Sequence, residues 1–360
     1  MKKISYFRIV FTILMFFLIF WLSPFHNKNK TNSQHNEEFS KATVLEVLES
    51  HSLNIQKVKV MVKEGVYKGK EFTVENTLQL GEDLLRLKEH DDVVLLITGE
   101  DKEKLDVTIY EYVREKNLLY LIIFFILLVI IVGGIKGVHA ISSVAFTICV
   151  ISIVLLPGLV KGYNPIKLTI ICSLIIAFFS LIIQQGFSKK TFSSLIGTLG
   201  GVTTAGIVTA IMSNTLRITI NSEEIIKLLK ISQNTKFDFQ AILFSSIVIG
   251  ALGANIDMSM SVATAMNEVK ESNKNISRGE LISCGMNVGR DVIGTMTNTL
   301  VLAYVGSSLV IFMIFMAYNV DLGYITNLED ISIEILRSLA GSIGIILSVP
   351  LTVFARAFME

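Results

Sequence analysis

Residues 118–156 have the sequence LLYLIIFFILLVIIVGGIKGVHAISSVAFTICVISIVLL, which is apolar with only short breaks. A helix needs about 20 apolar residues to cross the ~30 Å hydrocarbon core of a bilayer. This stretch therefore has the length of two crossings, which we place at residues 118–135 and 138–156. It predicts a membrane protein built from α-helices.

Further apolar runs extend this pattern to the end of the chain. They predict spans at residues 168–185, at 192–213, from near Phe239, at about 296–318 and at 333–353. An eighth span is expected at residues 1–23, where Lys2, Lys3 and Arg8 accompany the apolar run 4–22. That run is longer than the core of a cleavable signal and lacks a small-residue exit site, which favours an uncleaved signal anchor.

The basic residues orient these spans. Early positive charges hold an N-terminus in the cytoplasm, so residues 24–117 are expected outside the cell and both termini inside. Lys136, Lys189, Lys190 and Arg356 then fall on the cytoplasmic side, as do Lys270, Lys274 and Arg278. Lys161, Lys167 and the charges of residues 217–236 do not follow this rule. Part of the latter segment, around residues 225–229, could be an amphipathic surface helix.

The composition agrees with a membrane protein that carries one charged module. The 360 residues are 51% hydrophobic and 18% charged, against about 25% charged in ordinary globular proteins. The formal net charge of +1 excludes a basic nucleic-acid footprint. Residues 36–116 carry 12 basic and 18 acidic residues, so the charges gather in this segment.

This charged segment is expected to be a β-rich extracytoplasmic domain at residues 41–113, after a polar linker at 24–40. Five short runs rich in β-branched residues are separated by turn signals, such as Glu64-Gly65 and Lys68-Gly69. Five strands in about 75 residues suggest a small barrel of the OB or SH3 kind. Such a module could bind a partner above the membrane domain, or could be a solvated folding unit with no binding role.

Residues 249–309 contain polar side chains that an apolar span should not carry. Burying a carboxylate in hydrocarbon costs roughly 2.5–3.5 kcal/mol on insertion scales. Asp257, Ser261, Thr264 and Glu268 follow at i, i+4, i+7 and i+11, so they share one helix face. A pairing partner, a wet cavity or a bound ion is needed to compensate this cost.

A second polar face follows on the next helix, formed by Asn287, Arg290, Asp291, Gly294 and Asn298. Gly285 and Gly289 form a small-xxx-small pair that allows close helix packing. Residues 278–318 are about twice as long as one crossing, so we expect a half-helix or re-entrant piece followed by a full span from near Met296.

We expect these two faces to meet, with Arg290 neutralising Asp257 or Glu268 beside a hydrated path. The alternative is that Glu268, Arg290 and Asp291 lie in cytoplasmic water. The candidate polar pathway consists of Asn255, Asp257, Ser261, Thr264, Asn267, Glu268, Asn287, Arg290, Asp291 and Asn298. Asn214 and Arg217 are secondary candidates, because residues 212–216 (MSNTL) nearly repeat residues 296–300 (MTNTL).

The sequence resembles the YibE/F-like family of bacterial multi-pass membrane proteins. The resemblance rests on GANIDMSMS at 253–261, on Asn267-Glu268, on Gly289-Arg290-Asp291, on GTMTNTL at 294–300 and on Ala303-Tyr304. Essentially the whole chain is covered, and the bacterial plasma membrane is implied. Residues 88–92 (KEHDD) depart from the expected Gly-Asp turn. The family implies no biochemical activity, so no catalytic residue is carried over.

The polar faces favour a permease or transport-type protein that moves an ion or small polar solute. Alternatively, this transport-type protein would be the membrane half of an ATP-driven transporter and would dock a separate ATPase or other membrane subunit. An ATPase gene beside its own gene would indicate this alternative. A membrane-anchored receptor or assembly factor is the alternative class. In that class, removing residues 41–113 would abolish function while Asp257→Asn would be silent. A homo-oligomer is compatible with any of these, and a nucleic-acid partner is not expected.

An intramembrane enzyme is the least favoured class. Asp257, Glu268 and Asp291 could supply acid–base chemistry, but no catalytic motif accompanies them. Three separate cysteines and five scattered histidines give no metal-binding or disulfide pattern. No cofactor and no metal are therefore expected.

Overall fold

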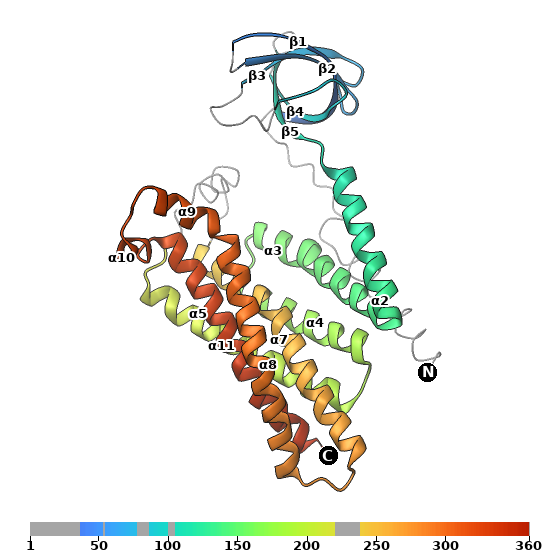
Figure 1. The fold of residues 1–360 in the computed structure, drawn as a ribbon, viewed down its shortest axis with the longest axis vertical. Helices are drawn as coiled ribbons and strands as arrows, with labels where there is room; N and C mark the ends of the chain where they lie inside the picture. Colours follow the sequence, from blue (N-terminus) through green and yellow to red (C-terminus); the bar gives the residue numbers. More distant parts are fainter. Residues whose placement is uncertain (1–36, 53–54, 78–85, 100–104, 220–237, 360) are drawn as a thin grey trace. The chain divides into compact units, whose positions relative to one another are not determined.

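The computed structural model describes residues 37–52, 55–77, 86–99, 105–219 and 238–359. The chain divides into two compact units, one that ends at Leu128 and one that extends from Val129 to the C-terminus. The first unit contains the strands and the second contains most of the helices (Figure 1). Helix α2 (Glu115–Val150) contributes to both.

The five expected strands are present and form a single antiparallel sheet in the order β3-β2-β1-β4-β5, curved into a half-barrel (Figure 1). The strands are β1 (Glu37–Ser52), β2 (Ile55–Val62), β3 (Glu71–Thr77), β4 (Asp92–Thr98) and β5 (Asp106–Tyr112). β1 begins four residues before the expected position 41. Its first part pairs with β4 and its second part with β2, so it lies at the centre of the sheet.

The core of this half-barrel is formed by every second side chain of its strands. In β2, Val58, Val60 and Val62 are buried while the residues between them are more exposed, and β4 buries Val93, Leu95 and Ile97 in the same way. Successive residues of a strand point to opposite faces, so these aliphatic side chains collect on one face. The period-2 pattern of the sequence therefore gives the sheet one apolar face.

The turn before β4 was expected to contain Gly-Asp, but it contains His90-Asp91. The φ of His90 is +70°, in the left-handed region that favours glycine. The backbone N–H of Lys88 donates to the Asp91 carboxylate at 2.7 Å, and the N–H of His90 donates to the carbonyl of Val44 at 2.9 Å. These two bonds hold the turn without a glycine.

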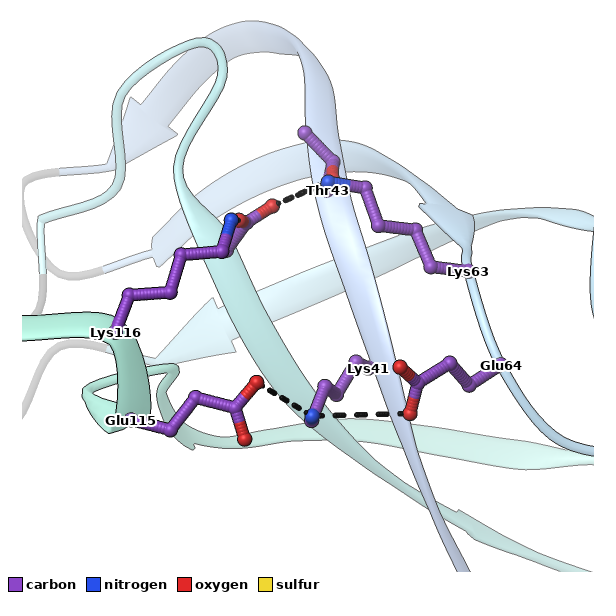
Figure 2. Close-up of polar contacts among 7 residues, drawn as sticks. Lys41, Thr43, Lys63, Glu64, Glu115 and Lys116 are labelled. Atoms are coloured by element: carbon purple, nitrogen blue, oxygen red, sulfur yellow. Dashed lines mark hydrogen bonds and ion pairs between the residues drawn. The ribbon is translucent and has the colours of Figure 1, made fainter. Parts of the chain in front are cut away.

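Two charge clusters join the sheet to the first turn of α2 (Figure 2). The Asp92 carboxylate accepts hydrogen bonds from Thr43 and Lys63, each at 2.7 Å, and from Lys116 at 3.4 Å. The Lys41 ammonium lies 2.7 Å from Glu115 and 3.8 Å from Glu64. Glu115 and Lys116 belong to α2, so the helix begins anchored to the half-barrel.

The helical unit continues from α2 through a short π-helix. Its elements are η3 (Ile151–Leu155), α3 (Leu156–Val160), α4 (Pro165–Gln185), α5 (Lys189–Thr215), α7 (Phe239–Ser272), α8 (Arg278–Ser307), α9 (Leu309–Ala317), α10 (Leu322–Ile325) and α11 (Glu329–Phe358). Polar side chains cap several of the N-termini. Ser188 caps α5, Asp238 caps α7, and Ser277 forms a capping box with Glu280 at α8.

Among the described residues, five helices are long and apolar enough to cross a membrane, or six when α8 and α9 are counted as one broken span. The stretch expected to hold two spans, at 118–135 and 138–156, is counted as one of the five. It is interrupted at Gly134, which has φ 54° and ψ −134°, outside the helical region. Eight crossings would require a division at Gly134 and a span at residues 1–23, which lie outside the described residues.

The broken segment is not where the sequence suggested. A half-helix was expected to end before a span beginning near Met296, but α8 runs without interruption from Arg278 to Ser307. The break is at Ser308, where α8 and α9 meet at 54°. The hydroxyls of Thr295 and Thr299 donate to the carbonyls of Val292 and Thr295, so these two polar side chains bond back to the continuous helix. The expected surface helix at 225–229 lies outside the described residues.

The helical core is organised around a very close crossing of α5 and α11. A Cβ added to Gly201 would lie 2.6 Å from the carbonyl oxygen of Gly344, and one added to Gly344 would lie 2.7 Å from the carbonyl oxygen of Gly201. The added Cβ of Gly201 would also overlap the side-chain oxygen of Asn255 on α7. Only glycine lets the two backbones approach so closely. Three helices are therefore locked together at one point.

This crossing predicts a strong and local effect of adding one methyl group. Gly201→Ala should lower the free energy of unfolding by roughly 1–3 kcal/mol, because the neighbouring atoms are backbone and a buried amide that cannot retreat. Thermal unfolding of the purified protein in detergent measures the effect. Gly253→Ala is the matched control, because nothing lies within 4 Å of its added Cβ. Equal melting temperatures for the two variants would contradict the crossing.

A second prediction concerns the half-barrel and pH. The hydrogen bonds from Lys63 and Thr43 lower the pKa of Asp92 from 3.8 to about 2. Because the pKa of Asp92 is lower in the folded than in the unfolded protein, the ionised carboxylate stabilises the folded state at pH values above 3.8. This stabilisation is lost as the pH falls from 3.8 towards 2. At pH 7, Asp92→Asn should cost about 1 kcal/mol at this partly exposed site.

Hydrogen exchange of the β4 amides in the full-length protein measures this cost. The difference between wild type and Asp92→Asn should shrink as the pH falls through that window. Asp106→Asn, at an exposed position of β5, is the control. A difference that stays constant from pH 7 to pH 2 would show that Asp92 is not the titrating group.

Candidate functional site

Helix α7 carries most of the candidate polar residues, and the structure places them in three different surroundings. Asn255 is completely buried between α5 and α11. Its amide nitrogen donates to the carbonyl of Ala251 at 2.8 Å, and its own backbone carbonyl accepts from the hydroxyl of Thr198 on α5 at 3.3 Å. Asn255 is therefore part of the packing core and not of an open path.

Ser261 and Thr264 instead line an open cavity of about 750 Å³ at the surface of the helical unit. This volume is within the range of sites that hold small molecules. The lining residues come from four helices: Lys136, Gly137 and Ala140 of α2, Gln184 and Gln185 of α4, Lys190 of α5, and Met260, Ser261, Thr264 and Ala265 of α7. We call this space the polar cavity.

Hydrogen bonds between helices hold the walls of the polar cavity in place. The amide of Gln185 donates to the Thr264 hydroxyl at 3.3 Å, which ties α4 to α7. The neighbouring amide of Gln184 donates to the Ser143 hydroxyl of α2 at 3.2 Å. The side chains that face the cavity are thus part of a connected frame.

The charges on the polar cavity are all of one sign. Lys136 and Lys190 line it, and no carboxylate is among the lining residues. Within the described ranges, neither lysine forms an ion pair. Because a recess walled by low-dielectric protein focuses the field of its charges, the polar cavity attracts anions.

Sequence reasoning found only two of the polar residues in this cavity. Ser261 and Thr264 were candidates, but Lys136 and Lys190 were used only to orient the spans. The amide pair Gln184-Gln185 was treated as the end of an apolar run. Two adjacent amides at the end of a span, followed closely by Lys189 and Lys190, were the signal that pointed to this site.

The other candidates on α7 lie elsewhere. Asp257 is exposed and lies one turn from Ser261 on the same helix face, whereas Glu268 is exposed nearer the end of the helix. Asn267 bridges two charges. Its oxygen accepts from the guanidinium of Arg356 at 3.0 Å, and its nitrogen donates to Glu271 at 2.6 Å. Arg356 is buried on α11, so Asn267 provides a hydrogen-bond acceptor to a buried guanidinium.

The polar face of α8 is exposed and does not pair with α7 as expected. Gly285 packs against Met266 of α7, and Gly289 packs against Val349 of α11. Arg290 donates to Asn287 of its own helix at 3.3 Å. Within the described residues, Arg290 forms no ion pair with Asp257 or Glu268. The glycine face of α8 is the packed one, which turns Asn287, Asp291 and Asn298 to the outside.

The secondary candidates lie far along α5 from the polar cavity. Asn214 donates to the carbonyl of Ala210 at 3.1 Å, and Arg217 follows the helix end with φ +52°. Residues 212–216 therefore end a helix, whereas the similar residues 296–300 lie inside α8. The two segments do not occupy equivalent places.

An ion pair that the sequence analysis missed lies beside the break at Ser308. Arg337 and Glu334 of α11 are 2.6 Å apart and only about one-quarter exposed. The Arg337 guanidinium lies 5.8 Å from the centre of the Tyr304 ring of α8. A small cavity of about 180 Å³ is lined by Tyr304, Ser308 and Glu334, among others.

Among the described residues, no group of three or more His, Cys, Asp or Glu side chains could hold a metal ion.

These features define the class of the protein. It is an α-helical protein whose long apolar helices are consistent with membrane spans, with a small β half-barrel before them. The chain belongs to the YibE/F-like family, because the model of the YibE/F-like protein family matches residues 121–360. Searches of curated proteins and of solved structures each found no match.

Proposed function

We propose that this protein is a permease or transport-type membrane protein and that the polar cavity is its solute site. The observation that carries the proposal is an open cavity of ligand size, lined by two lysines, two glutamines and two hydroxyls, among four apolar helices. A bundle that served only as an anchor would have no need of these groups. Polar groups at membrane depth mark substrate pathways in many transporters.

The charge of the polar cavity favours a small anion as the solute. Lys136 and Lys190 supply positive charge, and the amides and hydroxyls supply hydrogen bonds. Together they replace part of the hydration shell that an anion loses on entry. Asp257, one turn beyond Ser261, would repel an anion that moves further along α7. It could therefore limit passage or carry a coupled proton.

The polar cavity would open towards the cytoplasm. Lys190 lies near the N-terminus of α5, beside Lys189, and basic residues gather on the cytoplasmic side of membrane proteins. The half-barrel would then lie outside the cell, with both termini inside. Under this proposal, the protein resides in the bacterial plasma membrane.

A membrane-anchored receptor or assembly factor is the second candidate. One observation favours it: the Asp92 and Lys41 clusters fix the half-barrel to the first turn of α2. A partner bound to the half-barrel could therefore act on that helix directly. In this case the polar cavity would be dispensable and the half-barrel essential.

Flux through proteoliposomes tests the proposal. Lys190→Met should lower the uptake of small anions (chloride, phosphate and acetate tested separately) by about tenfold or more, because a charged hydrogen bond contributes ~1.5–3 kcal/mol. Lys189→Met is the matched control, because this neighbouring lysine is exposed and does not line the cavity. Its uptake should equal that of the wild type.

Two results would reject transport of these anions. One is a wild-type flux no greater than that of empty liposomes, and the other is an equal loss in both lysine variants. A growth phenotype that survives Lys190→Met but disappears on removal of residues 41–113 would favour the receptor.

A further inference from the structure

The exposed face of α8 carries charges that the rest of the described chain does not neutralise. Arg290, Asp291 and Asn298 are exposed, and Asp291 forms no ion pair within the described ranges. Arg290 is 12 residues from the start of α8, or about 18 Å at ~1.5 Å per residue, which is near mid-membrane for a spanning helix. Such charges cannot face lipid without a partner.

The two charges cannot neutralise one another within the helix. Arg290 and Asp291 are adjacent, and side chains at i and i+1 point about 100° apart and do not face each other. Between these two directions lie Asn287, Gly294 and Asn298, which form the centre of the exposed face. The face therefore has a neutral polar centre with a positive flank and a negative flank.

The centre of this face allows another helix to approach closely. Nothing lies within 4 Å of a Cβ added to Gly294. Asn287, Asp291, Gly294 and Asn298 follow at i, i+4, i+7 and i+11, the spacing of a seam between two parallel helices. Gly285 and Gly289 are already used against α7 and α11, so this seam is separate from the packing of the bundle.

We propose that α8 pairs with α8 of a second copy of this chain across a two-fold axis along the membrane normal. Such an axis brings the positive flank of one helix opposite the negative flank of the other. Arg290 then faces Asp291 of the second copy, and Asp291 faces its Arg290, at nearly the same depth. The face is its own complement, which is what an isologous dimer requires. This inference holds whether or not the polar cavity carries a solute.

The choice of a second copy rests on this charge pattern. The apolar run at residues 4–22 contains no carboxylate that could pair with Arg290. Lipid headgroups do not reach the middle of a span. An apolar helix of another protein would leave both charges unpaired.

Two single charge reversals give a decisive test. Arg290→Asp places two negative groups at each contact of its own homodimer, and Asp291→Arg places two positive groups there. Each variant alone should be monomeric by native mass spectrometry from mild detergent. A mixture of the two has opposite charges at both contacts. Co-expressed with different affinity tags, the two variants should therefore purify as a dimer with one copy of each.

Disulfide cross-linking provides a test that does not disturb the charges. Cys149, Cys172 and Cys284 are first replaced by serine. Asn298→Cys, at the seam, should then cross-link two full-length chains in native membranes under mild oxidation. Thr299→Cys, exposed on the same helix but turned away from the seam, should not.

Several outcomes would overturn the proposal. They are a monomeric wild type in both measurements, a cross-link for Thr299→Cys but not for Asn298→Cys, and a failure of the two charge variants to purify together. A cross-link from Asn298→Cys to a different protein, or to another segment of the same chain, would also overturn it.

Discussion

The whole helical unit depends on the contact between the backbones of α5 and α11 at Gly201 and Gly344. Because neither residue has a Cβ, the two helices approach until each glycine lies against the carbonyl of the other. This approach creates the slot that Asn255 of α7 fills. Hydroxyls of α5 then donate to backbone carbonyls of α7, as Thr198 does to Asn255 and Ser194 to Ser259. With one side of α7 fixed in this way, its other side is free to line the polar cavity with α2 and α4.

The polar residues of the bundle make physical sense when they are sorted by what neutralises them. A charge in hydrocarbon costs roughly 2.5–3.5 kcal/mol even on the most lenient scales. Arg356 donates one hydrogen bond to the neutral amide of Asn267, whereas Glu334 and Arg337 neutralise each other. Lys136 and Lys190 have no such partner among the described residues, but they border a cavity where water or a solute can reach them. Among the described residues, Arg290 and Asp291 have no partner of opposite charge, which is why a second chain is the simplest completion.

The sequence predicted those parts of the fold that local patterns control. Period-2 alternation located all five strands, and uninterrupted apolar runs located α4, α5 and α11 to within a few residues. It failed where distant segments decide the outcome. The length of residues 278–318 suggested a break before a span from near Met296, but α8 continues to Ser307, and the hydroxyls of Thr295 and Thr299 bond back to the helix. Gly201 and Gly344 are 143 positions apart, so nothing local showed that they touch. Likewise, the sequence used Lys136 and Lys190 to orient the spans, but only the folded bundle brings them to a common cavity.

The central claim is that an open, positively charged cavity lies among α2, α4, α5 and α7, and thiol labelling tests it most directly. In a background without native cysteines, Ser261→Cys lines the polar cavity, whereas Ala263→Cys, two residues along the same helix, is completely buried. A small membrane-impermeant anionic thiol reagent applied to the cytoplasmic face should modify position 261 rapidly and position 263 hardly at all, and Lys190→Met should slow the reaction at 261. Equal rates at the two positions, or no reaction at 261 from either face, would contradict the cavity.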